Sequence, residues 1–367
     1  MTSGADPAET PAQRPTRITY VVDSFAYGGA EAYLIHLLRS LPERFGPTLV
    51  ATLPVPRQLT SVAAELSVPV ATVDAVRGKL DLVRLVRQTR VVRATHPDLV
   101  HVNMTTAANG RHVIGALVTT ATPVVATLHS VAPVRSALQA KILRAAYRRL
   151  ASIVAVSEGT RRQLCDELGI NDRRVRIIAN GVETHNVPPR SPQRTVRIGS
   201  LGRLTHEKGF DLLVDAVAQL VSAGEEIAVS LGGEGVEREA LERRAQGLPI
   251  DFTGHVEDVE AFLAALDVFC LPSRWEGLPF SLLEAMMSGL PCVAADVGDI
   301  AVALGDAGIV VPPENVSSLA NALKRLVDSP AERLQLGSAA HARAKARFSV
   351  QAMVRATVAL YDESLAR

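Results

Sequence analysis

The chain has 367 residues, which exceeds what one ordinary hydrophobic core needs and suits two domains of about 150 to 200 residues each. Hydrophobic residues make up 47% of the sequence and charged residues 21%, a composition typical of a globular protein. The net charge of +1 and the aromatic content of 4% argue against a nucleic-acid-binding protein, because such surfaces combine basic grooves with stacked aromatic rings.

The charges are divided unevenly along the chain. Residues 1–185 contain 22 Lys and Arg against 14 Asp and Glu, a net charge of +8, whereas residues 186–367 contain 17 against 24, a net charge of −7. Two interpretations stay open: the halves attract each other across a shared cleft, or the first half binds something anionic.

Residues 1–16 are polar, lack the apolar segment of a secretory signal and predict a disordered tail. Cys165, Cys270 and Cys292 have no spacing for a metal or a redox pair. Three such cysteines suit a reducing cytoplasm, so we expect a cytoplasmic protein.

In the first half, short runs rich in β-branched residues alternate with longer amphipathic runs. The short runs predict strands at residues 17–22, 48–53, 98–103, 123–129, 152–157 and 174–182. The longer runs predict helices at residues 30–40, 79–95, 105–119, 134–150 and 158–168. The strands are almost continuously apolar, which is typical of a parallel sheet covered on both faces.

Residues 183–195 are rich in Pro and polar residues and predict a linker, after which the same alternation restarts. The second set of strands is expected at residues 196–203, 227–233, 251–255, 268–273 and 291–296. The second set of helices is expected at residues 211–223, 236–246, 258–266, 280–288, 315–327, 330–347 and 350–365. The sequence therefore predicts an α/β protein with two Rossmann-like, doubly wound domains, at residues 17–185 and 195–349.

Ligands of doubly wound sheets bind beyond the carboxyl ends of the strands, and two facing domains place them in the cleft between. Gly28 and Gly29 follow the first strand and would let a ligand approach the backbone, although a tight turn without a ligand is the alternative. The motif is not GxGxxG, so the NAD fingerprint is absent. Gly233 lies in a second glycine-rich turn, which by itself is weak evidence for a ligand site.

Arg203 and Lys208 lie five residues apart in a loop that opens a helix, an arrangement suited to a diphosphate. The chain has only 5 Lys against 34 Arg, so a Lys in this turn is notable, although a solvated pair is the alternative. His129 ends a strand, where catalytic groups collect, yet a core histidine is equally consistent with that position. We find no metal-ligand spacing among the histidines.

The stretch SRWEGLPFSLLEAMMSGLP, residues 273–291, contains Glu276 in a turn and Glu284 about one and a half turns inside a predicted helix. Pro279 suits the helix start, so the next amides, including those of Phe280 and Ser281, would be unpaired and would attract phosphate oxygens. Two carboxylates that bracket a phosphate site match a nucleotide sugar, which has hydroxyls on both sides of its diphosphate. The alternative is that Glu276 only caps the helix and that Glu284 only faces solvent.

These motifs together resemble retaining glycosyltransferases of the GT-B fold, family GT4, over nearly the whole chain after residue 16. The resemblance rests on GGAE (28–31), TLH (127–129), VSE (156–158), IANGV (178–182), GRLTHEKG (202–209), GGEG (232–235), FTGH (252–255), the Glu-x7-Glu segment and AGIVVPPEN (307–315). It departs from the family at Ser130, where an acid is common, and at Ala301–Val302, where many relatives have a Glu.

The resemblance implies a hexosyltransferase whose N-terminal domain holds the acceptor and whose C-terminal domain holds the nucleotide sugar. It implies that the last helix, residues 350–367, packs back on the N-terminal domain. It also implies catalysis with retention, and neither a metal nor another cofactor is expected. The implied catalytic residues are His129, Glu276, Arg203 and Lys208. The implied donor-binding residues are Gly28, Gly29, Gly233, His255, Val256, Gly277, Leu278, Phe280, Ser281 and Glu284.

The acceptor stays open at this level. We favour a UDP-sugar donor and a small polar or natural-product acceptor. Basic amphipathic segments at residues 77–93 and 135–149 leave open a peripheral membrane protein with a glycolipid or polysaccharide acceptor. The rivals are an epimerase or phosphorylase of the same fold and a non-catalytic nucleotide-sugar-binding protein. The sequence does not indicate an oligomeric state.

Overall fold

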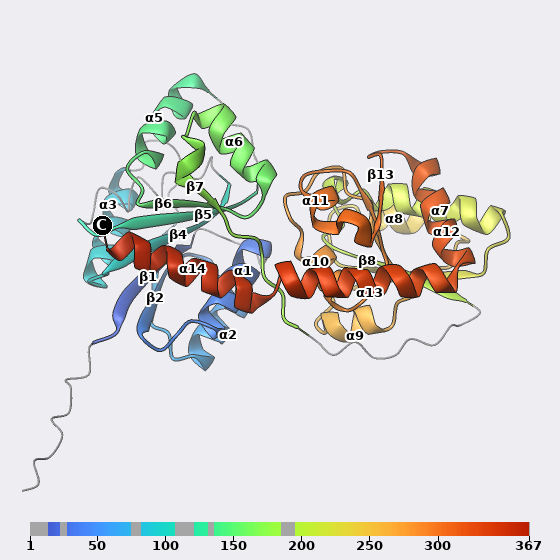
Figure 1. The fold of residues 1–367 in the computed structure, drawn as a ribbon, viewed down its shortest axis with the longest axis horizontal. Helices are drawn as coiled ribbons and strands as arrows, with labels where there is room; N and C mark the ends of the chain where they lie inside the picture. Colours follow the sequence, from blue (N-terminus) through green and yellow to red (C-terminus); the bar gives the residue numbers. More distant parts are fainter. Residues whose placement is uncertain are drawn as a thin grey trace, which may run out of the picture.

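A computed structural model describes residues 14–22, 28–74, 82–106, 121–130, 136–184 and 195–366. Two lobes lie side by side, each built around its own parallel sheet (Figure 1). The predicted pair of doubly wound α/β domains is thereby confirmed.

The N-terminal sheet has seven strands in the order β3-β2-β1-β4-β5-β6-β7, all parallel. Its strands are β1 (Thr16–Val22), β2 (Phe45–Thr52), β3 (Val70–Val73), β4 (Leu99–Thr106), β5 (Val124–Ser130), β6 (Ser152–Ala155) and β7 (Val175–Ile177). The described helices of this part are α1 (Gly29–Arg39), α2 (Arg57–Glu65), α3 (Leu82–Ala94), α5 (Ala137–Tyr147) and α6 (Glu158–Leu168). One apolar core lies under α1 and α2, and a second lies under α3, α5 and α6, so helices cover both faces.

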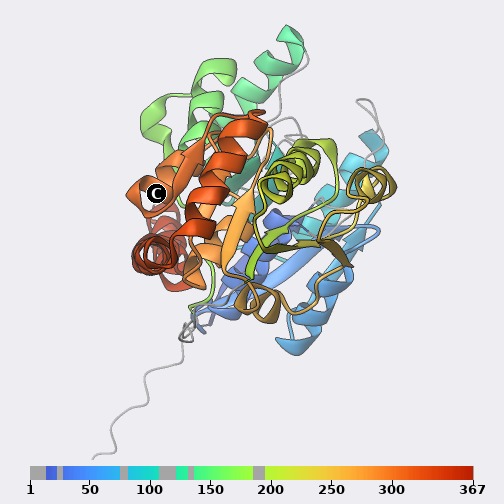
Figure 2. The same ribbon diagram turned by 90° about the vertical axis from the view of Figure 1, so that its right-hand side faces the viewer.

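The C-terminal sheet has six parallel strands in the order β10-β9-β8-β11-β12-β13. Its strands are β8 (Val196–Leu201), β9 (Ile227–Gly232), β10 (Ile250–Gly254), β11 (Val268–Leu271), β12 (Cys292–Ala295) and β13 (Ile309–Val311). Its helices are α7 (Phe210–Ser222), α8 (Arg238–Arg244), α9 (Val259–Ala264), α10 (Phe280–Met287), α11 (Ile300–Leu304), α12 (Val316–Asp328) and α13 (Pro330–Arg347). Helices on both faces of this sheet are visible in Figure 2.

Helix α14 (Val350–Leu365) follows α13 after a short break and lies against the N-terminal sheet (Figure 1). Its Met353, Leu360 and Tyr361 belong to the same core as α1. The chain therefore crosses between the lobes twice, and the crossings touch: Val182 N donates to Phe348 O at 2.8 Å, and Val350 N donates to Val182 O at 3.1 Å.

Several predicted elements need correction. The helix expected at residues 105–119 is wrong at its start, because Thr105 and Thr106 continue β4, and residues 107–120 lie outside the described part. The strand expected at 174–182 ends at Ile177. Helices α2 and α11 and strands β3 and β13 were not anticipated. Most of the predicted tail and linker, residues 1–13 and 185–194, also lies outside the described residues.

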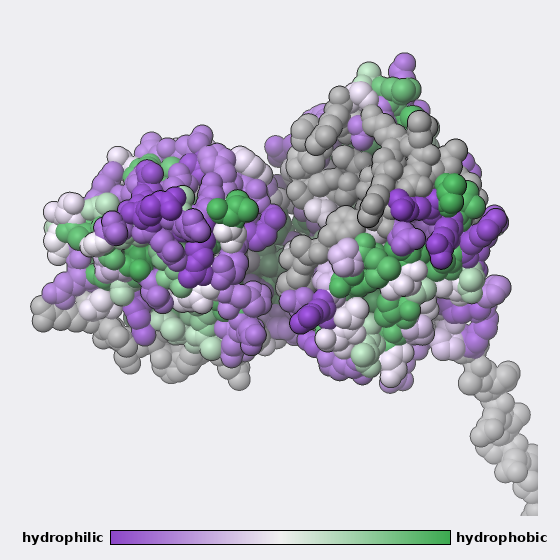
Figure 3. Space-filling view, turned by 180° about the vertical axis from the view of Figure 1, so that it is seen from behind, coloured by the Kyte–Doolittle hydropathy of each residue, from purple (hydrophilic) through white to green (hydrophobic). Residues whose placement is uncertain are grey.

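Seen from behind, the two lobes are separated by a furrow; hydrophilic residues cover most of the C-terminal lobe, and the N-terminal lobe also shows a hydrophobic patch (Figure 3). No helix among the described residues is long and apolar enough to cross a membrane. In each sheet the order reverses beside the first strand, at β1/β4 and at β8/β11. Loops after these strands are where a doubly wound fold binds its ligands.

Candidate active site

Lys208 and Glu276 form an ion pair at the switch point of the C-terminal sheet. Lys208 lies in the 3-10 turn His206–Lys208 after β8, and Glu276 lies in the loop between β11 and α10. Lys208 Nζ is 2.5 Å from Glu276 Oε1, which also accepts a bond from Ser273 Oγ at 2.9 Å. Their side chains are only 18% and 9% exposed, so the pair is largely shielded from water. The structure thus joins two residues that the sequence proposed for separate roles.

Arg203 lies apart from this pair. Its side chain is 69% exposed, and its Nη2 donates to Glu207 Oε1 at 2.6 Å, one turn ahead in the same loop. An exposed guanidinium is free to reorient, so a role for Arg203 in binding a diphosphate remains a prediction.

Arg274, which the sequence analysis did not single out, ties the two loops together. Its guanidinium donates to both carboxylate oxygens of Asp211 at 2.8 Å and to His206 O at 2.9 Å, and its Nε donates to Glu314. Its backbone N donates to Glu207 O at 2.8 Å. The Arg274 side chain is 9% exposed. The turn that carries Lys208 is therefore anchored to the loop that carries Glu276 by one buried arginine.

The start of α10 lies beside this pair. The helix begins at Phe280 after Pro279, as the sequence predicts, so its first backbone amides have no carbonyl partner within the helix. Leu278, just before the start, is buried, and Ser281 is half-buried in the first turn. Such a helix start is positively polarised and suits phosphate oxygens.

Glu284 lies in the second turn of α10 and is half-buried. Among the residues that the structure describes, no hydrogen bond or ion pair of its carboxylate is found. Burial raises the pKa of Glu284 to about 7. A desolvated carboxylate without a protein partner is poised to accept hydrogen bonds from a ligand.

His129 ends β5 in the N-terminal domain and is buried. Its Nε2 is 2.8 Å from Asn103 Oδ1, and Asn103 Nδ2 in turn donates to Ala30 O at 2.9 Å. Asn103 therefore presents an oxygen to the imidazole, so Nε2 carries the proton. Nδ1 is then an acceptor, and it is buried with no hydrogen bond found to it within the described residues. Burial lowers the pKa of His129 to about 3, so the ring is neutral at pH 7.

The two domains meet at this site. A Cβ on Gly277 would lie 3.1 Å from the carbonyl oxygen of His129, and a Cβ on Gly29 would lie 3.3 Å from the Phe280 ring. Asn180 Nδ2 donates to Leu278 O at 2.8 Å. The GGAE turn and the strand end of His129 therefore face the Glu276–Phe280 loop, while residues 23–27 before the turn lie outside the described residues.

The remaining predicted residues lie at the ends of β9 and β10. Gly233 has a φ of +134°, and a Cβ there would lie 1.9 Å from Gly202 O, so only glycine suits this position. Val256 packs beside Gly232, and His255 is exposed. These turns flank the Lys208 loop, because β10, β9 and β8 are neighbours in the sheet.

Comparison with known proteins identifies the family. Residues 195–329 match the family described as "Glycosyl transferases group 1", and residues 27–186 match "Glycosyltransferase Family 4", so the two matches cover both domains. The chain belongs to the family 4 glycosyltransferases. The resemblance inferred from its motifs is thus confirmed.

Individual relatives match this family 4 member over part of their length. A 2-deoxystreptamine glucosyltransferase of Streptomyces kanamyceticus is 32% identical over 51% of this chain and 54% of its own. An MMP α-(1→4)-mannosyltransferase of Mycolicibacterium hassiacum is 29% identical over 60% and 56%, and a lipopolysaccharide core mannosyltransferase of Rhizobium meliloti is 27% identical over 60% and 67%. The first two matches span only about half of the relative's length.

Solved structures share the complete fold. The Anabaena HepE protein in complex with UDP superposes with a TM-score of 0.79 over 94% of this chain and 99% of its own, at 21% identity. Sucrose-phosphate synthase of Thermosynechococcus elongatus gives 0.77 over 96% and 100%, at 18% identity. At these identities the likeness establishes the GT-B fold alone.

Proposed function

We propose that the protein transfers a hexose from a nucleotide diphosphate sugar to a hydroxyl of a small polar acceptor, with retention at the anomeric carbon. The observation that carries the proposal is the convergence of three features at one sheet edge. These are the Lys208–Glu276 pair, the first amides of α10, which have no partner within the helix, and Glu284, whose carboxylate has no partner among the described residues.

Each of these three features would bind a different part of the nucleotide sugar. The diphosphate would lie over the α10 amides with Lys208 beside it, because both favour negative charge that grows as the sugar leaves. Glu276 would accept bonds from sugar hydroxyls once Lys208 turns to the phosphates. Glu284 would bind ribose hydroxyls, and the turns at Gly233, His255 and Val256 would flank the base.

The reaction follows from that placement. The bond between the anomeric carbon and the phosphate oxygen breaks, and the acceptor oxygen forms its bond on the same face. The leaving phosphate takes the acceptor proton, and a nucleoside diphosphate and a glycoside result. His129 is neutral, so it would orient the sugar or acceptor rather than supply a proton.

We propose UDP as the nucleotide and no resident metal. The UDP-bound and UDP-glucose-bound structures of Anabaena HepE support the nucleotide. Among the described residues no group of three or more His, Cys, Asp and Glu could hold a metal ion. Undiminished turnover after EDTA treatment would support metal independence, and loss that Mg²⁺ or Mn²⁺ restores would refute it.

A membrane-bound acceptor is the alternative to the small acceptor, and one feature of the N-terminal domain favours it. Helices α3 and α5 carry basic residues beside strongly exposed apolar ones, including Val83 at 81% and Leu138 at 69% exposure. This combination suits a membrane-bound acceptor, and the relatives include an enzyme of lipopolysaccharide core synthesis. We favour the small acceptor because arginines of α3 also have partners within the protein, such as Asp74 for Arg87.

A thermal-shift panel with UDP-, GDP-, ADP- and dTDP-sugars tests the proposed donor site. A ligand that binds the native state raises its melting temperature. We expect UDP-sugars to stabilise wild type but not Lys208→Ala. Lys324→Ala is the matched control, because Lys324 forms its ion pairs on the surface of the same domain, with Glu225 and Asp328. No stabilisation by any nucleotide sugar, or equal stabilisation of Lys208→Ala, would contradict the proposal.

A further inference from the structure

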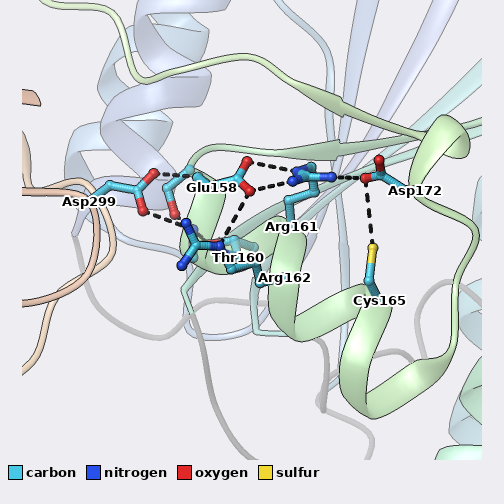
Figure 4. A network of polar contacts seen from close by, with 9 residues as sticks. Glu158, Thr160, Arg161, Arg162, Cys165, Asp172 and Asp299 are labelled. Carbon is cyan, nitrogen blue, oxygen red and sulfur yellow. Dashed lines mark hydrogen bonds and ion pairs between the residues drawn. The ribbon is translucent and has the colours of Figure 1, made fainter. Parts of the chain in front are cut away.

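Asp299 of the C-terminal domain binds the start of helix α6 in the N-terminal domain (Figure 4). Its Oδ1 accepts a hydrogen bond from Gly159 N at 2.8 Å, and its Oδ2 accepts one from Glu158 N. Glu158 and Gly159 are the first two residues of α6, 140 positions or more away in the chain. One carboxylate thus bridges the domains.

The bridge suits the chemistry of a helix start. The first amides of a helix lack intrahelical partners and carry partial positive charge, so a carboxylate binds them with charge-assisted hydrogen bonds. The local cap, Ser157 Oγ, takes a different amide, that of Thr160, at 3.1 Å. A Cβ on Gly159 would lie 3.3 Å from Asp299 Oδ1, so glycine permits the close approach. Asp299 is itself buried.

Neighbouring charges are arranged so that the bridge does not meet an unpaired like charge. The Glu158 side chain turns toward Arg161 and Arg162, with Arg161 Nε at 2.7 Å and Arg162 Nε at 3.3 Å (Figure 4). Arg161 also pairs with Asp172. The carboxylate of Glu158 is therefore neutralised by its own helix, and the amides are left to Asp299.

The turn that carries Asp299 also packs against the loop that carries Glu276 and Gly277. Asp299 N donates to Gly277 O at 3.1 Å. Gly298, one residue earlier, has a φ of +57°, and a Cβ there would lie 2.2 Å from Glu276 O. The turn at Gly298–Asp299 therefore packs directly on the backbone of Glu276 and Gly277, while its side chain reaches α6.

We propose that Asp299 is a positioning residue that couples closure of the two domains to placement of the Glu276–Gly277 loop. When the α6 amides bind the carboxylate, the turn is drawn toward the N-terminal domain, and the loop is held beneath His129. This inference rests on the proposed donor site, because it assigns the loop its importance.

Kinetics of three variants test the coupling. We expect Asp299→Ala to lower kcat/KM for the donor about 10- to 100-fold, the range for losing charged hydrogen bonds. Asp299→Asn keeps the side-chain shape and one acceptor oxygen, so its kcat/KM should lie between those of wild type and Asp299→Ala. Asp296→Ala is the control: Asp296 is exposed in the same connection, and within the described chain its carboxylate has no hydrogen bond or ion pair. It should stay within about twofold of wild type.

A distance measurement separates this inference from the proposed function. Spin labels at Leu138→Cys in α5 and Val236→Cys before α8 occupy exposed positions on opposite domains, and Cys165→Ser removes the half-exposed native thiol. With no substrate present, we expect Asp299→Ala to shift the distance distribution to longer, broader values and Asp296→Ala to leave it unchanged. Circular dichroism checks that each variant is folded.

Two results would overturn the inference: an unchanged distribution in both Asp299 variants, or an altered distribution with kcat/KM intact. Failure of the proposed function looks different. In that case wild type would bind no nucleotide sugar, while the labels would still report the bridge between Asp299 and α6.

Discussion

Glu276 and Glu284 lie eight positions apart, yet their surroundings separate them chemically. Glu276 pairs with the charge of Lys208 and accepts a hydrogen bond from Ser273, whereas Glu284 has no such partner in the described chain. Burial raises the pKa of Glu284 from 4.5 to about 7. The folded state thus binds this proton more tightly than the unfolded chain, so the stabilisation is complete below about pH 4.5 and is lost as the pH rises through about 7.

We therefore predict that Glu284→Gln stabilises the free protein at pH 8 and not at pH 4.5. The gain at pH 8 is about 3 kcal/mol at most, because a shift of one pKa unit corresponds to about 1.4 kcal/mol. Thermal melts of both proteins between pH 4.5 and 8 measure it. The same variant should lose stabilisation by UDP-sugars. Equal melting curves at pH 8, or full donor stabilisation of Glu284→Gln, would contradict this account.

The sequence allows these carboxylates and Lys208 to be proposed as site residues because their local signals are strong: glycines, a proline at a helix start and a rare lysine. It could not anticipate Arg274 or Asp299. Arg274 and Asp211 are 63 positions apart in the sequence, and Asp299 and Gly159 are 140 positions apart. Neither contact can therefore be detected from the spacing of neighbouring residues. Residues that position a site through tertiary contacts emerge only from the folded chain.

At the scale of elements, the Lys208 turn and the loop before α10 depend on Arg274. We predict that Arg274→Ala lowers the free energy of unfolding by about 3 kcal/mol, because it leaves Asp211 in a partly buried place without its charge partner. Urea denaturation measures the loss.

Arg244→Ala is a matched control for Arg274→Ala. Arg244 forms the same two-bond pair with Asp215 at 2.7 Å, but its side chain is 50% exposed, so we expect a loss of about 1 kcal/mol or less. Equal losses for the two variants would refute the anchoring role of Arg274.

Helix α14 is held to the N-terminal sheet by a buried polar network as well as by apolar packing. Tyr361 OH is 2.6 Å from His101 Nδ1 and donates to Tyr20 OH at 3.1 Å. We predict that Tyr361→Phe lowers the free energy of unfolding by about 1 to 3 kcal/mol, because two buried polar atoms lose a partner. Chemical denaturation tests this, and a loss under about 0.5 kcal/mol would be inconsistent with the network.

Most strands were predicted near their observed positions, including the edge strands β7 and β10, whereas β3, β13 and α11 were not anticipated. Strand β3 has two exposed residues among four, and β13 and α11 have only three and five residues, so their periodicity is too short to detect. The end of β4 was not predicted because Thr105 and Thr106 are as compatible with the start of a helix as with the end of a strand.

At the scale of the molecule, the excess positive charge of the N-terminal half raises the question of membrane binding. We predict that wild type binds anionic liposomes weakly, if at all, because an exposed salt bridge to Asp74 already engages Arg87. Liposome sedimentation at low and high salt measures this. Strong, salt-sensitive binding that disappears when Arg84, Arg87 and Arg90 are changed to Gln would instead favour the membrane-bound acceptor.

The most direct test of the account is a crystal structure with the nucleoside diphosphate that gives the largest thermal shift. We predict its phosphates within hydrogen-bond distance of Lys208 Nζ and the amides of Phe280 and Ser281, and its ribose hydroxyls on Glu284. A nucleotide bound elsewhere, or one whose ribose does not touch Glu284, would contradict the proposed donor site.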